Sequence, residues 1–322
     1  MRLDAGSLEA RQVPVCFAAV AAGIVAGLLW PPLARGMELL VGPALVVLMY
    51  AMFVQLPLRG RRALVAQPRF IAALLLANFL FVPALVWALA AWLAPDPALL
   101  AGMLLVLLTP CIDYVVVFTR MARGDAAALL GATPLLLVLQ WLLLPVYLML
   151  IMRGEQAPDL AFAPFLGAFL LFIVLPLGLA WLTLRITATS GHADGGWRKP
   201  CAWLPVPAMA VVLLLVSGSR VGEVVEEGGR LATVLPACVA FALLAPLAGM
   251  LAARLLALPV PAARAVAFSA GTRNSLVVLP LALALPGEAG HLAGLAVVAQ
   301  TLVELLAEIG FIRVIPRLIP TT

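Results

Sequence analysis

The sequence predicts an all-α membrane protein with ten transmembrane helices in two inverted five-helix repeats, in which helices 4 and 9 are broken and cross. Three observations support this prediction. The 322 residues are 65% hydrophobic and only 11% charged, whereas a soluble domain is about half apolar and about a quarter charged. The apolar residues form segments long enough to cross a bilayer. Polar residues interrupt two of these segments at corresponding places in the two halves.

The ten apolar segments follow from length, because about 20 apolar residues cross a bilayer. Their expected bounds are 13–30, 37–57, 69–93, 98–121, 126–151, 160–184, 200–217, 231–256, 263–285 and 291–312. Five spans in each half is an odd number, so the second half must be inverted relative to the first. We place the first repeat at 1–184, a cytoplasmic linker at 185–199 and the second repeat at 200–322. Since the sixth span begins near 160, the repeat boundary proper falls near 155.

Basic residues are unevenly distributed over the connections between spans. Connections on the side of the two termini hold most of the Lys and Arg residues. Those on the opposite side hold only Arg35, Arg153, Arg220 and Arg230. The positive-inside rule therefore predicts cytoplasmic termini, and we expect a multi-pass protein of the bacterial plasma (inner) membrane. The net charge of +5 is spread over short loops, so no nucleic-acid partner is expected, and the apolar composition makes the lipid bilayer the expected partner.

The first interruption lies in the fourth span, where Thr109, Pro110, Cys111 and Asp113 stand within an apolar run. The second lies in the ninth span, where residues 269–275 read SAGTRNS. A helix in lipid cannot leave backbone polar groups without partners, so both stretches must face protein or a cavity. Paired interruptions of this kind are the best sequence indication of a binding site between inverted repeats.

Asp113 and Arg273 are charges about half-way through their spans. Each costs about 2.5–3.5 kcal/mol on membrane-insertion scales. Because the two interrupted helices are expected to cross, we expect these side chains to pair or to face each other across one cavity. They form a buried ion pair that fixes the crossing, or they handle a substrate or protons, and the two roles are compatible.

The remaining candidates lie in the same two helices and in the last span. Thr109, Asn274 and Ser275 are polar groups expected to line a substrate site, together with Cys111. Cys111 is a potential ligand for a soft, thiophilic solute, although most buried cysteines only fill space. The other cysteines lie on other spans, so no three-sulfur cage is expected; they are Cys16, Cys201 and Cys238.

Glu304 lies well inside the last span and shares a helix face with Gln300 and Glu308. Glu304 is the expected proton-coupling residue, whereas Glu308 is expected nearer the interface and solvated. The sequence has no phosphate-binding loop and no CxxC pair, so we expect no ATP site, no resident metal, no other cofactor and no enzymatic activity.

Two stretches resemble the bile acid:sodium symporter superfamily. The first runs from Pro110 to the Ala-Arg-Gly-Asp sequence that ends at Asp125, and the second is FSAGTRNS at 268–275. The resemblance covers nearly the whole chain. It implies a secondary transporter with a four-helix scaffold (spans 1, 2, 6 and 7) and a six-helix core (spans 3–5 and 8–10).

The chain departs from the sodium-coupled members at the residues that bind the ions. It has Val115 and Val116 in place of a Ser-Asn pair, and Ser269 and Arg273 in place of a Glu and a Gln. Two valines supply no side-chain oxygen, and a guanidinium repels a cation. Thr133 and Asn274 remain but are too few. We therefore expect that sodium coupling is lost and that Arg273 stands in for the missing cation.

The arsenite-permease branch is more similar. It has a Cys in the fourth helix, as Cys111 is here, and a Val-Glu pair in the tenth, matched by Val303-Glu304. The match is incomplete, because an Asn-Asp pair of that branch is Thr119-Arg120 here. The resemblance implies efflux of arsenite or antimonite, with Cys111 contacting the metalloid and Glu304 exchanging a proton. The alternative is a transporter of a small organic anion whose carboxylate pairs with Arg273.

Overall fold

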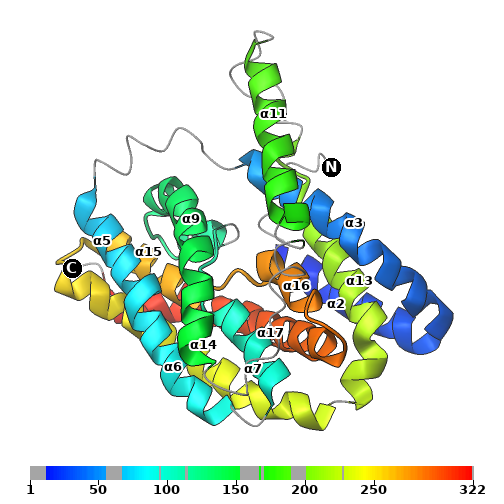
Figure 1. The fold of residues 1–322 in the computed structure, drawn as a ribbon. Helices are drawn as coiled ribbons and strands as arrows, with labels where there is room; N and C mark the ends of the chain where they lie inside the picture. Colours follow the sequence, from blue (N-terminus) through cyan, green and yellow to red (C-terminus); the bar gives the residue numbers. More distant parts are fainter. Residues whose placement is uncertain are drawn as a thin grey trace. The chain divides into compact units, whose positions relative to one another are not determined.

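The computed structural model describes residues 12–55, 67–93, 96–112, 115–152, 167, 170–189, 201–226 and 228–320. These residues are almost entirely helical, which confirms the predicted class, and Figure 1 shows the course of the chain. They belong to two compact units. Unit 1 comprises Met1–Leu56 and Phe162–Gly229, and unit 2 comprises Pro57–Ala161 and Arg230–Thr322. This division agrees with the scaffold and core that the family resemblance implies.

Unit 1 is a set of closely packed apolar helices. They are α2 (Gln12–Leu29), α3 (Pro31–Gln55), the π-helical turn η3 (Leu170–Val174), α11 (Leu175–Thr189) and α13 (Pro205–Glu226). α13 packs along both α2 and α3. A Cβ added at Gly23 of α2 would lie 2.3 Å from the carbonyl oxygen of Leu214, so glycine permits this close approach. The first residues of the predicted linker continue α11, and its remainder lies outside the described residues, so the linker stays a prediction.

Unit 2 contains the two interrupted helices. Its elements are α5 (Pro68–Leu76), η1 (Ala77–Phe81), α6 (Val82–Leu93), α7 (Pro97–Leu107), α8 (Val115–Met121), α9 (Ala126–Ile151), α14 (Gly228–Leu255), α15 (Val260–Gly271), α16 (Ser275–Leu283) and α17 (Glu288–Leu318). The long helix α17 packs against α7 and α16, and more lightly against α8 and α15 (Figure 1). It therefore touches elements of both interrupted spans.

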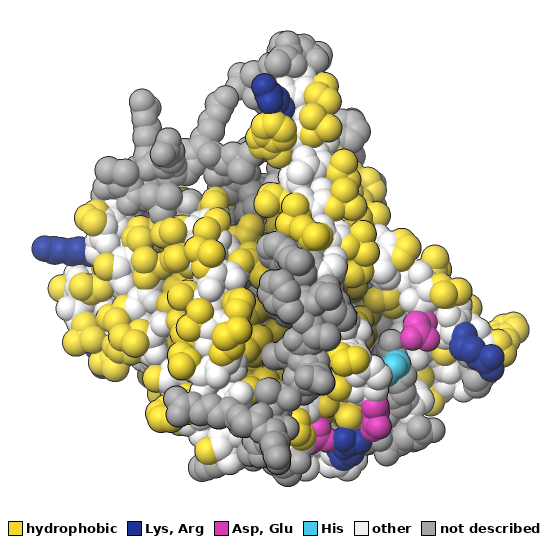
Figure 2. All heavy atoms as spheres, in the orientation of Figure 1, with side chains coloured by type: hydrophobic (Ala, Val, Ile, Leu, Met, Phe, Trp, Pro, Cys, Tyr) yellow, Lys and Arg dark blue, Asp and Glu magenta, His cyan; other side chains and the backbone are white. Residues whose placement is uncertain are grey.

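Six helical segments among the described residues are long and apolar enough to cross a membrane. They are Pro32–Gln55, Pro68–Ala91, Ala126–Ile151, Leu170–Thr187, Gly228–Leu255 and Glu288–Leu318. Figure 2 shows hydrophobic side chains over most of the described surface on one face, with charged side chains in only a few places. An apolar exterior of this kind is what contact with lipid requires. The inverted arrangement of ten spans stays a prediction.

A π-helical turn interrupts the helix formed by α5 and α6. Pro83 has no N–H, so it cannot donate to the carbonyl oxygen of Phe79 as an ordinary helical residue would. The hydroxyl group of Tyr147 in α9 donates to that oxygen instead, at 2.6 Å. The turn η1 lies immediately before the proline and contains the fully buried Asn78. π-helical turns of this kind often mark functional positions.

An ionic cluster lies at the end of α7 away from its interruption. Asp96 caps α7 by accepting from the backbone N–H groups of Ala98 and Leu99, and Arg230 pairs with both Asp96 and Glu288. Burial alone would raise the pKa of Asp96. The hydrogen bond from Arg230, the two backbone hydrogen bonds and the charge of Arg230 outweigh that effect, so its pKa lies below its ordinary value. The cluster joins the first turns of three helices of unit 2.

Candidate functional site

Both interruptions predicted from the sequence are present in unit 2. The helix that begins as α7 stops and resumes as α8, and the helix that begins as α15 stops and resumes as α16. We call the described residues 108–112 break 1 and residues 272–274 break 2. Asp113 lies outside the described residues, so its predicted pairing with Arg273 stays a prediction.

The two breaks cross and satisfy each other's backbone groups. The N–H of Cys111 donates to the carbonyl oxygen of Thr272 at 3.0 Å, and the N–H of Asn274 donates to that of Thr109 at 2.9 Å. The two segments run antiparallel at this point, where Pro110 of break 1 pairs with Arg273 of break 2. A bilayer offers no water to unpaired backbone groups, so each break gives the other the partners that its own helix has lost.

Two of the predicted substrate-binding residues are part of break 1. The hydroxyl group of Thr109 lies 3.0 Å from the carbonyl oxygen of Leu105 and 3.1 Å from that of Val106, so it completes the last turn of α7. Cys111 is completely buried, and its backbone is held by break 2. Its thiol therefore lies on the crossover itself.

The guanidinium group of Arg273 is held by acceptors from three helices. Its Nη2 atom, which has two hydrogens, lies 2.9 Å from Asn78 Oδ1, 2.5 Å from the carbonyl oxygen of Ser269 and 2.7 Å from that of Ala270, so these acceptors share its hydrogens. Its Nη1 atom lies 3.4 Å from the carbonyl oxygen of Leu107. Three of these oxygens belong to the last turns of α7 and α15, where the helix dipoles are negative.

Burial and an aromatic ring complete the environment of this cation. Arg273 is completely buried, and its guanidinium carbon lies 5.5 Å from the centre of the Phe241 ring. Asn78 holds the cation from η1 and also donates to Ser269 Oγ at 3.0 Å. Asn78 was not assigned to the site from the sequence. An amide side chain in an otherwise apolar segment was the available signal.

Two carboxyl groups of α17 contact break 2. The backbone N–H of Arg273 donates to Glu304 Oε1 at 2.9 Å, and Gln300 Nε2 lies 3.5 Å from Glu304 Oε2. Glu308 Oε1 lies 2.6 Å from Thr272 Oγ1. Glu308 is completely buried, so the expectation that it is solvated is wrong. The sequence showed that the two carboxyls share a face, but it did not show that both face the break.

The amino-terminal end of α16 presents polar side-chain groups that have no hydrogen-bond partner among the described residues. Asn274 and Ser275 are each 1% exposed, and neither the amide group of Asn274 nor the hydroxyl group of Ser275 makes a hydrogen bond. Buried polar groups almost always have partners, and this helix end carries a partial positive charge. The two residues were predicted to bind substrate, and the structure places Asn274 at the end of break 2 and Ser275 directly after it.

The Ala-Arg-Gly-Asp sequence forms the turn between α8 and α9. Arg123 adopts a left-handed backbone conformation, with φ of 58°, and Asp125 caps α9 by accepting from the N–H of Ala128. The buried side chain of Arg264 donates to the carbonyl oxygen of Ala122. The hydrogen bonds of Asp125 and Arg264 hold the backbone of this turn in place.

The other three cysteines belong to elements other than break 1. Cys16 and Cys201 belong to unit 1. Cys238 lies in α14 of unit 2, where its sulfur is 3.8 Å from the sulfur of Met103. Cys111 is therefore the cysteine of break 1. Cys238 is a second buried cysteine of unit 2, so it can serve as a control for substitutions of Cys111.

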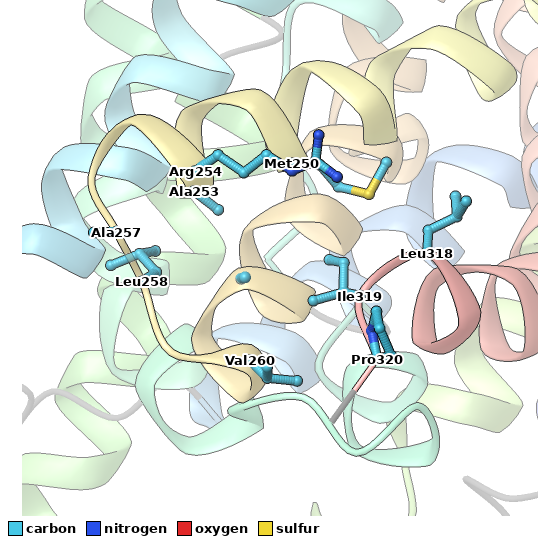
Figure 3. Close-up of a pocket in the computed structure, with 10 residues that line it drawn as sticks. Met250, Ala253, Arg254, Ala257, Leu258, Val260, Leu318, Ile319 and Pro320 are labelled. Carbon is cyan, nitrogen blue, oxygen red and sulfur yellow. The ribbon is translucent and has the colours of Figure 1, made fainter. Parts of the chain in front are cut away.

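A separate pocket of about 360 Å³ lies where α14 and α15 meet the end of α17. Figure 3 shows Arg254 along one wall and Leu318, Ile319 and Pro320 on another. None of the residues predicted to bind substrate lines this pocket. The side chain of Arg264 donates to the carbonyl oxygen of Ile319 and so holds that wall in place.

Comparison with known proteins identifies the family. The model of the sodium bile acid symporter family matches residues 42–227, which is more than half of the chain and includes break 1. No curated protein matches the chain. Members of this family are transporters and not enzymes, and the apolar helices agree with a multi-pass protein in a lipid bilayer. The chain belongs to the sodium bile acid symporter family.

Proposed function

We propose that this protein is a secondary transporter that works without sodium and expels arsenite or antimonite. It acts by alternating access, in which unit 2 moves relative to unit 1. The observation that supports sodium independence is the position of the Arg273 guanidinium group, which is bound by carbonyl oxygens at the ends of two interrupted helices. We further propose the bacterial plasma membrane as its location, with both termini in the cytoplasm.

Carbonyl and amide oxygens are the ligands that a hard cation such as Na⁺ requires. At the crossover, oxygens of this kind already bind a permanent cation, since an arginine side chain does not lose its proton in proteins. A sodium ion there would have to displace the guanidinium group or share the space with a like charge. Val115 and Val116, at the start of α8, offer no side-chain oxygen as a second place.

The metalloid assignment depends on Cys111 and its surroundings. Arsenite at neutral pH is the uncharged triol As(OH)₃, and a thiol can replace one hydroxyl group. An S–As bond forms, the As–O bond breaks, and the thiol proton leaves with the hydroxyl group as water. The remaining hydroxyl groups need hydrogen-bond partners, which Asn274 and Ser275 can supply at the same crossover.

A small organic anion is the second candidate substrate. Its carboxylate was expected to pair with Arg273, but that guanidinium group is completely buried and bonded to protein acceptors. The amino-terminal end of α16 is a better position, because a partial positive charge meets there the side-chain groups of Asn274 and Ser275, which have no hydrogen-bond partner in the described part of the chain. In that case the thiol of Cys111 has no direct role.

Replacement of single cysteines separates the two substrates. Purified protein is reconstituted in liposomes, and arsenite flux is measured in choline buffer without sodium. We expect flux in the wild type, a loss of at least tenfold in Cys111→Ser, and a rate within twofold of wild type in Cys238→Ser, which replaces another buried thiol of unit 2. Unchanged flux in Cys111→Ser would exclude the metalloid mechanism at its central residue. Flux of carboxylates, with none of arsenite, would support the organic anion.

In this proposal, transport is either coupled to protons or not coupled to any ion. Glu304 remains one candidate for the proton carrier, because it is buried and holds the backbone of break 2.

A further inference from the structure

The pocket of about 360 Å³ beside α14 lies where two candidate spans end. The segment Gly228–Leu255 ends directly after Arg254, and the segment Glu288–Leu318 ends at Leu318. Arg254 and Leu318 both line the pocket. A helix that crosses a bilayer ends near the lipid headgroups, so the pocket lies at about headgroup depth. The positive-inside rule predicts that this end of α14 faces the cytoplasm.

Among the described residues that line the pocket, Arg254 is the only one with a charged side chain. It is exposed, it belongs to the last turn of α14, and its side chain makes no hydrogen bond or ion pair with another described residue. Figure 3 shows this side chain extended along the wall of the pocket toward Met250. The pocket therefore presents a positive charge that no carboxylate of its described lining balances.

Three backbone acceptors at the pocket are already bonded. The carbonyl oxygens of Ala253 and Arg254 accept from N–H groups of the turn that follows α14, at 3.0 and 3.1 Å. The carbonyl oxygen of Ile319 accepts from the Nε and Nη2 atoms of Arg264, at 3.2 and 2.9 Å. A cation in the pocket would have to compete for these oxygens and would also meet the charge of Arg254.

Backbone donors at the same pocket have no acceptor. Helix α15 begins beside it, with Val260 and Ala263 in the lining. No side chain caps this helix at Pro259, and the N–H groups of Val260 and Ala262 make no hydrogen bond with another described residue. The amino-terminal end of a helix carries a partial positive charge and attracts anions. Together with Arg254, these donors favour an anionic ligand.

The rest of the lining is apolar, which distinguishes this pocket from a site for a soluble anion. The side chains of Met250, Leu258 and Leu318 contribute to it. Leu318 and Leu255 are exposed, so apolar surface continues from the lining. Apolar surface at the end of a span faces the acyl chains of the bilayer. The ligand that fits both features carries its negative charge on an apolar chain.

We propose that this pocket binds an anionic phospholipid of the surrounding bilayer. The phosphate group lies between the guanidinium group of Arg254 and the first turn of α15, and one acyl chain starts along Met250 and Leu318. Basic pockets between transmembrane helices on the cytoplasmic side bind such headgroups. Because Arg264 ties the Ile319 wall to the turn before α9, bound lipid should also stabilise unit 2. Binding of this lipid does not depend on which substrate is transported.

The site is tested by native mass spectrometry on purified protein from which lipid has been removed. Dioleoylphosphatidylglycerol is the anionic probe, and phosphatidylcholine with the same acyl chains is the neutral comparison. We expect wild-type protein to bind the anionic lipid at least tenfold more tightly than the neutral one, and Arg254→Gln to lose this preference. The matched control is Arg313→Gln, an exposed arginine of α17 outside the lining, which should stay within twofold of wild type. Wild-type affinity in Arg254→Gln, or an equal loss in Arg313→Gln, would overturn the proposal.

A second variant places a negative charge in the pocket. In Val260→Asp the carboxylate stands in the first turn of α15, where the helix dipole stabilises it, so the variant should fold. It should repel the phosphate group and weaken lipid binding at least tenfold, and unchanged binding would contradict the proposed position of the headgroup. Inorganic phosphate in millimolar excess separates the two sources of a phosphate group. We expect it to leave the lipid bound, whereas full displacement would show a site for free phosphate and refute the lipid assignment.

Discussion

Replacement of Arg273 by Gln removes the permanent cation from the crossover. The substitution removes the two Nη2 hydrogens that Asn78 Oδ1 and the carbonyl oxygens of Ser269 and Ala270 share. Hydrogen bonds to a charged group contribute about 1.5–3 kcal/mol each, so two of them give a gross loss of about 3–6 kcal/mol. Relief from burying a charge offsets part of this loss, and removal of one partner of a buried charged pair typically costs about 3–5 kcal/mol. We therefore expect a loss of about 3–5 kcal/mol in the free energy of unfolding.

The same variant should gain a response to sodium. Without the guanidinium group, the oxygens that it occupied become available to a cation, so sodium should raise the thermal midpoint of Arg273→Gln but not that of the wild type. The assay is unfolding in detergent, with sodium replaced by choline at constant ionic strength. The matched control is Arg264→Gln, a buried arginine of α15 bonded to Ile319, which should lose stability without responding to sodium. A stable Arg273→Gln, or a wild type stabilised by sodium, would refute the reasoning.

Two further predictions concern the stability of unit 2. A Cβ at Gly102 of α7 would lie 2.3 Å from the carbonyl oxygen of Ala293 in α17, so Gly102→Ala should cost about 1–3 kcal/mol, measured by thermal unfolding. In contrast, Gly310→Ala meets no atom within 4 Å and should be neutral or stabilising; equal losses in both variants would contradict the close packing. The pKa of Asp96 is lower in the folded state than its ordinary value of 3.8, so the ionised carboxylate stabilises the fold at pH values above 3.8. This stabilisation is lost as the pH falls below about 4 and passes through the folded-state pKa. The thermal midpoint of Asp96→Asn should therefore fall less over that acidic range than that of the wild type, and identical pH profiles would exclude the effect.

The helices of the fold could largely be predicted from the sequence, because hydropathy reports directly on segments that lie in lipid. The segment predicted at 126–151 is α9 with the same bounds. The interruption around Thr109 was also predictable, since a proline and polar residues cannot continue an apolar helix without partners. The hydrogen bond from Tyr147 to the carbonyl oxygen of Phe79 in η1 was not predictable, because the two residues are distant in the sequence.

The site was only partly predictable, because many of its acceptors are backbone carbonyl oxygens. The sequence showed that Arg273 is a charge within a span, but every residue has a carbonyl group, so no residue type marked Ser269 or Ala270 as its partners. The burial of Glu308 was missed for a different reason. Distance along a span was taken as depth, whereas α17 runs on to Leu318 and keeps Glu308 against break 2.

Sodium dependence of flux tests the central claim most directly. Wild-type protein is reconstituted in liposomes, and initial rates of arsenite flux are compared in sodium buffer and in choline buffer at the same pH and ionic strength. Because Arg273 already occupies the oxygens at the ends of the interrupted helices, we predict equal rates in the two buffers. A rate that rises with sodium concentration and saturates would show that sodium binds and drives transport, and would contradict the account.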